Sequence, residues 1–246
     1  FRSLMEVHHP HHPTHKKKWS EYIIEFVMLF AAVTLGFFAE NIREHLAENE
    51  KKAELMKIVS LDLQRDLKQL EFHKKDALVK YSTCDSIFPI LNMDPKKINR
   101  RQYYHLLFNH LAYWDFNPND KSKNDADAKG YFRNEENAEL ALYISKINFF
   151  LLDYKTIEQE TVRLRSKLKE QLEDITEHKY YNYVLSFEMK KIPDTIGIMP
   201  PNQQVIKKVA YTITNFKLAY IGYLDDIDSL KKYSYKAIEL INKKYK

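Results

Sequence analysis

The sequence predicts an all-α protein in which one N-terminal transmembrane helix continues into a long stalk helix, packed with two further long helices as an extracytoplasmic helical bundle. Three observations lead to this prediction. The 246 residues include only 4 Gly and 8 Pro, and so few helix breakers favour long helices. One apolar segment near the N-terminus is long enough to cross a bilayer. Elsewhere, apolar residues recur at alternating steps of three and four.

Composition excludes several classes of protein. Lys and Arg exceed Asp and Glu by 39 to 34, which is a mild excess in a Lys-rich chain. No zinc finger, aromatic RNA-binding motif or arginine-dense helix accompanies it, so we expect no nucleic-acid partner. Cys84 is the only cysteine, which excludes an internal disulfide and a zinc site built from several cysteines.

Residues 1–18 form a tail rich in His and Lys that we expect in the cytoplasm. A metal-binding tract is one interpretation. Prolines within the tail interrupt any regular helical spacing of such ligands, so we favour a solvated tail beside the lipid headgroups. The candidate metal ligands would be His8, His9, His11 and His12.

Residues 19–41 are predicted to form the transmembrane helix. The eighteen residues from Tyr22 to Ala39 contain Glu25 as their only acidic or basic side chain. They would extend about 27 Å as a helix, close to the roughly 30 Å of a hydrocarbon core. A core helix of a soluble protein would show a polar face, and a cleaved signal peptide would end in small residues. The segment has neither feature, which favours a membrane span.

Side chains that flank this segment indicate anchoring and orientation. Trp19 and Tyr22 stand where an aromatic belt would hold one end of the span. Lys16, Lys17 and Lys18 precede the span, whereas the basic residues after it are diluted by acidic ones. Because basic flanks tend to stay in the cytoplasm, we expect a bacterial inner-membrane protein with its N-terminus in the cytoplasm and its C-terminal region in the periplasm.

Glu25 shares one helical face with Ala32 and Gly36, since positions seven and eleven residues further along return to within about 20°. Ala32 and Gly36 form a small-xxx-small pair, which permits close approach of another helix. A carboxylate in hydrocarbon is costly unless it meets a partner, so we expect a membrane helix interface at this face. Two alternatives remain: Glu25 reaches the headgroups, or it takes part in proton transfer.

Residues 42–246 are predicted to form the bundle, with helices at about 42–88, 98–114, 134–190 and 202–244. No Pro or Gly interrupts the chain from 37 to 88, so we expect the span to continue directly into the first of these helices. In the short second helix, two histidines lie five residues apart, which suits packing better than shared metal binding. The two long helices that follow keep core spacing over several heptads, as bundle or coiled-coil helices do.

The polar segment between the second and third of these helices is expected to be a loop, at 115–137. Within it, Asp125, Asp127 and Glu136 match positions 1, 3 and 12 of a calcium-binding loop, with Gly130 at position 6. A lysine stands at position 5, where an oxygen ligand is required. We therefore expect a turn at Gly130 and no bound metal.

The sequence contains none of the short motifs that mark common active sites. It has no Gly-rich phosphate loop, no G-x-S-x-G, no H-E-x-x-H and no Cys–His nucleophile pairing. Its aromatic residues are dispersed at helical spacing, which suits core packing better than a cofactor site. We therefore expect neither enzymatic activity nor a cofactor.

The N-terminal stretch "HHPTHKKKWSEYIIEFVMLFAAVTLGFFAENIREH" (11–45) resembles the signature of an uncharacterised family of bacterial single-pass membrane proteins. Members carry a His-rich tail, a basic and aromatic flank, a span with one early Glu, "GFFAEN-RE" at its exit and then a helical region. The stretch "LDLQRDLKQLE" (61–71) is similar to the family's stalk, and "KGYFRNEENAELALYISKI" (129–147) to its turn into the third helix. The resemblance implies the topology described above and carries no assigned activity.

These features favour a membrane-anchored structural or interaction protein that self-associates or joins another membrane protein complex. Its partners would be the lipid bilayer and, through the span and stalk, a second copy of the chain. An extracytoplasmic ligand-sensing domain is one alternative, although a cytoplasmic tail of residues 1–18 is too short for an output domain. An accessory subunit of a proton-driven membrane machine that uses Glu25 is another.

Overall fold

The computed structural model describes residues 18–133, 135–186 and 188–245, and most of them are helical. Within these residues the one β contact is a single bridge between Asn99 and Ile196, so the all-α prediction is confirmed. Six α-helices occur in this part of the chain: α1 Trp19–Leu91, α2 Arg100–Phe108, α3 Lys121–Ala128, α4 Ala138–Glu173, α5 His178–Leu185 and α6 Gln203–Lys244. Three 3-10 helices lie between them: η1 Pro95–Lys97, η2 Glu135–Asn137 and η3 Met189–Lys191.

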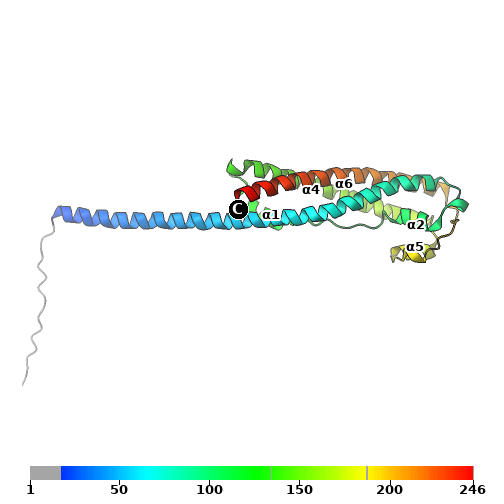
Figure 1. The fold of residues 1–246 in the computed structure, drawn as a ribbon, viewed down its shortest axis with the longest axis horizontal. Helices are drawn as coiled ribbons and strands as arrows, with labels where there is room; N and C mark the ends of the chain where they lie inside the picture. Colours follow the sequence, from blue (N-terminus) through cyan, green and yellow to red (C-terminus); the bar gives the residue numbers. More distant parts are fainter. Residues whose placement is uncertain (1–17, 134, 187, 246) are drawn as a thin grey trace, which may run out of the picture. The chain divides into compact units, whose positions relative to one another are not determined.

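The chain divides into two compact units, residues 1–51 and 52–246, and α1 contributes to both (Figure 1). In the first unit the described residues form part of this single helix. Their side chains are exposed, apart from the half-buried Thr34. The predicted continuity of the apolar segment with the helix that follows is therefore confirmed. The second unit contains the remainder of α1 and all the other helices.

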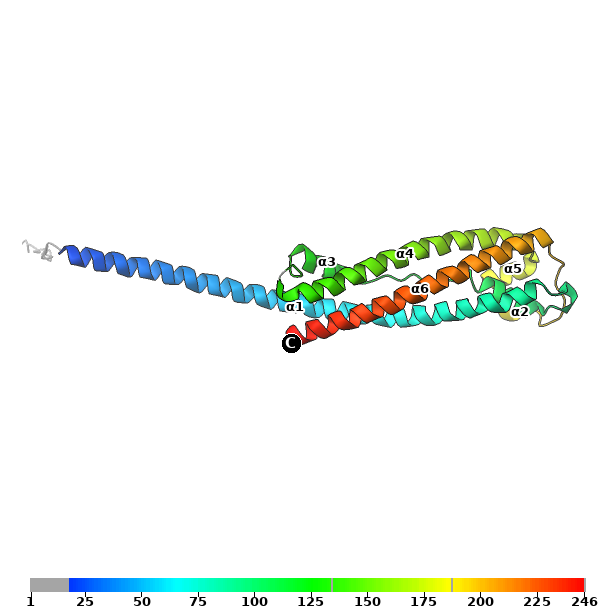
Figure 2. The ribbon, with the colours of Figure 1, turned by 90° about the horizontal axis from the view of Figure 1, so that it is seen from above.

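Three long helices build the second unit, namely α1 from Lys52 onward, α4 and α6. Figure 2 shows α4 and α6 side by side, and they run in opposite directions. Gly222 of α6 makes this close packing possible, because a Cβ atom there would lie 2.7 Å from the Cδ1 atom of Ile157 in α4. The missing side chain thus leaves room for the end of Ile157.

Ion pairs link α1 to α6 along the second unit. Lys231 of α6 pairs with Glu71, and nearby Asp228 pairs with Lys74. Further along, Lys217 pairs with Asp85. Exposed ion pairs contribute little to the free energy of unfolding, so these contacts are better understood as fixing the register of two helices held by their apolar faces.

Two apolar cores fill the second unit. The first lies where α1 ends and includes Leu107 of α2, Leu168 of α4 and Phe216 of α6. The second includes Met56 of α1 and Ile147 of α4, among others. Residues of α2 and α5 contribute to the first core, and a residue of α3 contributes to the second. Polar side chains occupy the region between them.

The predicted helices at 42–88 and 202–244 agree closely with the structure. α1 extends to Leu91, because Pro89 falls in its last turn, where its missing N–H removes only one backbone hydrogen bond. α6 begins after Asn202, whose Oδ1 accepts a hydrogen bond from the backbone N–H of Gln204 at 2.8 Å. This is the contact expected of a residue that caps a helix N-terminus.

The single helix predicted at 134–190 is wrong beyond Glu173, because α4 ends there and a separate helix, α5, begins only at His178. In the turn between them, the hydroxyl of Thr176 donates to the carbonyl of Leu172 at 2.5 Å. Such a bond competes with helical backbone bonds. The backbone N–H of Glu177 donates to the Tyr104 hydroxyl of α2 at 2.9 Å, which draws the chain away from the α4 axis.

The short helix predicted at 98–114 also ends early, because α2 stops at Phe108. Two contacts hold the following residues in a non-helical path. The carbonyl of Ala112 accepts a hydrogen bond from Nζ of Lys80 at 2.6 Å, and His110 is fully buried beside Tyr220 of α6. Tertiary contacts with α1 and α6 therefore override the local helical preference.

The predicted loop at 115–137 contains a helix, α3, which the sequence did not reveal. Its sequence "KSKNDADA" has a single kind of apolar residue, alanine, and no periodic apolar face. The helix is held by contacts to α1 instead, since the hydroxyl of Ser122 donates to Oδ2 of Asp62 at 2.7 Å. Ala126 is fully buried in the second core.

Candidate functional site: an uncovered apolar helix and a buried polar layer

The N-terminal part of α1 is the one helix among residues 18–133, 135–186 and 188–245 that is long and apolar enough to cross a membrane. None of its apolar window is buried. Trp19 is 82% exposed, Phe26 68% and Phe37 70%. A helix that is apolar on all sides in water is unstable in isolation, and nothing in the described chain covers this one, so it is not a core helix of the second unit.

The predicted interface residues Glu25, Ala32 and Gly36 all lie on this exposed stretch. Apart from the two adjacent residues and the backbone of its own helix turn, no heavy atom of the described chain comes within 4 Å of the place where a Cβ of Gly36 would lie. Another helix can therefore approach the backbone there without displacing anything. Further along, Arg43 pairs with Glu40 through Nε and Oε2 at 2.9 Å.

Of the predicted membrane anchors, the structure describes Lys18, Trp19 and Tyr22, and all three are exposed. Lys16 and Lys17 lie outside the described residues. The histidines proposed as metal ligands, His8, His9, His11 and His12, lie outside them as well.

The residues that match a calcium-binding pattern do not form an extended loop. Asp125 and Asp127 lie on α3, and Glu136 belongs to η2. Oδ1 of Asp127 faces Nη2 of Arg133 at 3.9 Å, where a cation would compete with the guanidinium. In the part of the chain that the structure describes, no three His, Cys, Asp or Glu side chains are grouped so that they could hold a metal ion.

The polar region between the two cores is a feature that sequence reasoning missed. It surrounds a cavity of about 30 Å³, roughly the space of one water molecule in the liquid. We call the side chains around it the polar layer. Its members come from α1, the segment after α2, α4 and α6, and include His73, Asp76, Lys80, Tyr113, Tyr154, Glu158, Arg165, Tyr220 and Tyr223.

Two cations of the polar layer are held by different means. Lys80 is 4% exposed, and its Nζ donates to Oδ2 of Asp76 at 2.7 Å as well as to the carbonyl of Ala112. Burial lowers the pKa of Lys80, and the bond to Asp76 opposes that shift. The guanidinium of Arg165 stacks over the ring of Tyr113, with its Cζ 3.8 Å from the ring centre, and burial lowers its pKa too.

Histidine and thiol groups near the layer are unreactive. His110 Nδ1 lies 3.2 Å from the Tyr220 hydroxyl, and its Nε2 lies 3.9 Å from Sγ of Cys84. Burial lowers the pKa of His110 to about 3, so the imidazole is neutral. Burial also raises the pKa of Cys84 to about 12, which keeps the thiol protonated and non-nucleophilic. The Cys–His contact therefore serves packing.

The extended segment 112–120 lies across α1 on one side of the layer. Lys80 holds its first residue, and Gln69 donates to the carbonyl of Asn117 at 3.4 Å. At its far end, Asp66 accepts from both the backbone and the side-chain nitrogen of Asn119, at 3.0 and 2.7 Å. Buried polar groups that are satisfied in this way fix one arrangement of the chain, because a shifted register would leave them unpaired.

A larger cavity of about 300 Å³ lies between α2 and the segment from α5 to η3. Its lining is mostly apolar and includes Phe108, Leu111, Val184 and Met189, with His105 and Asn109 as its polar groups. It offers shape without paired acids, bases or nucleophiles.

One sequence signal could have revealed the polar layer. On α1 the buried positions Leu70, His73, Ala77, Lys80 and Cys84 continue the core spacing, so a histidine and a lysine stand at core positions. Ionisable residues at such positions are rarely buried without partners, and the partners come from distant segments.

Comparisons of the chain with protein-family models, with curated proteins and with solved structures found no match. The resemblance of its N-terminal stretch to a bacterial membrane-protein family therefore stays a prediction.

Proposed function

We propose that this protein is a membrane-anchored interaction protein, whose α1 spans a bilayer and whose second unit contacts other proteins. The observation that supports this most directly is that every apolar side chain from Trp19 to Ala39 is exposed. Burying one large apolar side chain is worth about 1.5–3 kcal/mol, so leaving this many in water would oppose folding strongly. A hydrocarbon environment removes that cost.

The proposed orientation places the N-terminal tail in the cytoplasm and the second unit in the periplasm of a bacterial cell. Its support is the run of lysines before the apolar segment, against the mixture of Arg43, Glu44, Glu48 and Lys51 after it. A reporter fused after Lys246 should then behave as extracytoplasmic. Cytoplasmic reporter activity, or release of the intact chain by carbonate wash, would contradict the proposal.

Within the bilayer, the proposed partner is a second copy of α1 or a helix of another membrane protein. The open backbone at Gly36 and the small side chain of Ala32 support it, because van der Waals packing between membrane helices depends on close approach. Interhelical hydrogen bonds of a side chain such as Glu25 contribute about 0.6–2 kcal/mol in membranes. Close packing should therefore matter at least as much as this one polar group.

Cysteine crosslinking in native membranes tests the interface. We expect Gly36→Leu to reduce crosslinking of α1 strongly, Glu25→Gln to reduce it less, and Phe30→Leu to leave it unchanged. Phe30 is 63% exposed on another side of the helix and serves as the matched control. If Gly36→Leu and Glu25→Leu both leave crosslinking and co-purifying proteins unchanged, this face is not an interface.

A further inference from the structure

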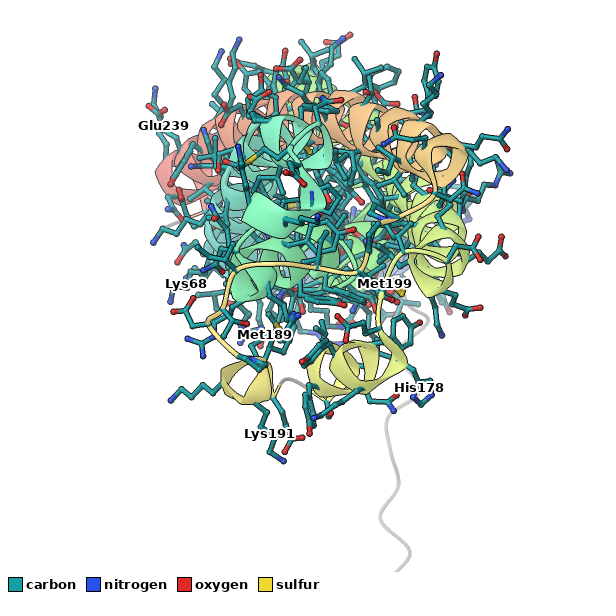
Figure 3. All side chains as sticks on the ribbon, turned by 90° about the vertical axis from the view of Figure 1, so that its right-hand side faces the viewer. Lys68, His178, Met189, Lys191, Met199 and Glu239 are labelled. Carbon is teal, nitrogen blue, oxygen red and sulfur yellow. The ribbon has the colours of Figure 1, made fainter. Side chains whose placement is uncertain are left out.

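Two loops meet at the end of the second unit where α1 finishes. One joins α1 to α2, and the other leads from η3 to α6 (Figure 3). Backbone hydrogen bonds tie them together: Arg100 N–H donates to Thr195 O at 2.8 Å, and Gly197 N–H donates to Ile98 O at 2.8 Å. We call the surface formed by residues 92–99 and 188–202 the loop end. Its cross-links make it a rigid platform.

Three apolar side chains stand exposed on the loop end. Ile196 is 71% exposed, Met199 45% and Met93 43%. Gly197 follows Ile196 with a φ of +100°, a conformation that other residues rarely adopt, and it lets the chain turn directly behind the isoleucine. Ile198, only one residue beyond, is buried in the first core. The exposure of Ile196 is therefore set by the turn.

The two loops also carry exposed lysines. Lys96, Lys97 and Lys190 are exposed and form no ion pair within the described residues. Two of the three carboxylates of the loop end are paired with cations, and the third, Asp94, keeps its negative charge. Asp94 caps η1, Asp194 pairs with Arg101 at 3.4 Å, and Glu188 pairs with Lys191 at 2.6 Å.

Acidic residues outside the loop end do not reverse this balance. Glu173 and Asp174 lie where α4 ends, and Glu177 pairs with Arg100 at 3.8 Å. Lys207 and Lys208, both exposed in the first turns of α6, add further positive charge. The unpaired charge around the loop end is therefore positive.

We propose that the loop end binds the surface of an anionic lipid bilayer. Exposed apolar side chains can enter the boundary between headgroups and acyl chains, while lysines beside them are attracted to anionic lipid. An acidic protein is less well matched, because a stable protein interface needs about 800 Å² per partner and the loop end presents only three exposed apolar side chains. The loop end would thus contact a membrane peripherally, at a surface separate from the apolar part of α1.

The apolar part of α1 must be covered by lipid so that it does not bind the vesicles itself. The full chain is therefore first placed in nanodiscs of zwitterionic lipid. Binding of these nanodiscs to vesicles of 70% phosphatidylcholine and 30% phosphatidylglycerol is then measured by flotation. We expect binding that Ile196→Asp weakens at least tenfold. The combined Lys96→Gln, Lys97→Gln and Lys190→Gln variant should weaken it at least tenfold as well. Raising the salt concentration from 0.1 to 0.5 M should weaken vesicle binding by the unchanged protein.

Matched controls lie elsewhere on the second unit. Leu152→Asp replaces a side chain of the same size as Ile196 that is 68% exposed on α4, and it should leave vesicle binding unchanged. Lys232, Lys236 and Lys243 are exposed toward the end of α6. Replacing all three with Gln should weaken vesicle binding less than threefold. Equal binding to purely zwitterionic vesicles, no binding at all, or equal losses from the control variants would overturn the proposal. So would capture of an acidic protein by the loop end without any vesicle binding. None of these results bears on whether α1 spans a membrane.

Discussion

The two parts of α1 are one continuous helix but differ in how their apolar residues are distributed around it. From Lys52 onward α1 buries one face, where Met56, Leu63 and Leu70 join the second core with residues of α4 and α6. From Tyr22 to Ala39 the apolar residues surround the helix, and none of that window is buried. Most stability of a water-facing helix comes from packing one amphipathic face, whereas an all-round apolar helix needs an apolar surrounding. Substitutions in the two parts should therefore have different consequences.

The largest difference should come from removing one aromatic side chain in each part. Phe216 is fully buried and stacks on His110 and Tyr220, so Phe216→Ala should lower the free energy of unfolding by about 3–5 kcal/mol. Phe30→Ala should change it by less than about 0.5 kcal/mol, because Phe30 lies outside both cores. Urea unfolding of the full chain in detergent, followed by the fluorescence of Trp114 in a Trp19→Phe background, measures both. Equal losses would mean that the second unit depends on the apolar helix.

Charged pairs in the two parts should differ next most strongly. Asp76→Ala leaves the ammonium of Lys80 buried with the carbonyl of Ala112 as its remaining partner, so we expect a loss of about 2–4 kcal/mol. Adding Lys80→Met should restore part of it, because the unpaired charge is removed. The exposed Glu40–Arg43 pair is the control, and Glu40→Ala should cost less than about 0.5 kcal/mol. If the double variant is no more stable than Asp76→Ala alone, the hydrogen bond from Lys80 to Ala112 contributes more to stability than the unpaired charge removes.

Periodicity in the sequence is sufficient to predict the long helices and the cores. Residues such as Leu63, Leu168 and Phe216 recur at helical spacing and are buried as expected. The bounds of α6 follow from Asn202, a residue type that favours N-caps. Local pattern is enough in these places because packing and propensity agree.

The turns and the polar layer could not be predicted in the same way. α4 ends at Glu173 without Pro or Gly, because Thr176 bonds back to Leu172 and Glu177 donates to Tyr104, which lies 73 residues earlier. α3 has no apolar face, and its place depends on Asp62 of α1. The partners of Lys80 lie on its own helix and 32 residues away. Sequence spacing carries no information on such tertiary pairings.

The stability of the second unit should depend on pH through Asp226. This residue is 4% exposed, its Oδ2 has no hydrogen-bond partner among the described residues, and burial together with Asp153 and Asp225 raises its pKa to about 6. An acid whose pKa is higher in the folded chain than in the unfolded chain binds a proton more tightly when folded. Asp226 should therefore contribute a rise in the free energy of unfolding as the pH falls from about 7 to about 4, and His110, whose pKa is lower in the folded chain, should contribute a fall below about pH 6.5.

Replacing this acid separates its effect from those of other groups. Asp226→Asn should stabilise the protein by about 1–2 kcal/mol at pH 8, and this gain over the unchanged protein should shrink as the pH falls from about 7 to about 4. Asp228→Asn is the control, since Asp228 is exposed and pairs with Lys74 of α1. Urea unfolding at several pH values provides the measurement. The same pH dependence in both variants would assign it to another group.

The smallest expected effects come from the two helical glycines. Gly222 of α6 lies inside the second unit, and Gly36 lies on the exposed part of α1. At Gly222 a Cβ would lie 2.7 Å from Cδ1 of Ile157, so Gly222→Ala requires this flexible side-chain end to move. Alanine in a helix is favoured over glycine by about 1 kcal/mol, which offsets much of that cost. We expect a net change of less than about 1 kcal/mol, and a more stable protein when Ile157→Val is added to make room. Gly36→Ala meets no atom of the described chain, and unfolding of the second unit should be unchanged. If Gly36→Ala alters urea unfolding of the second unit while Gly222→Ala does not, close packing at Gly222 does not limit the approach of α4 and α6.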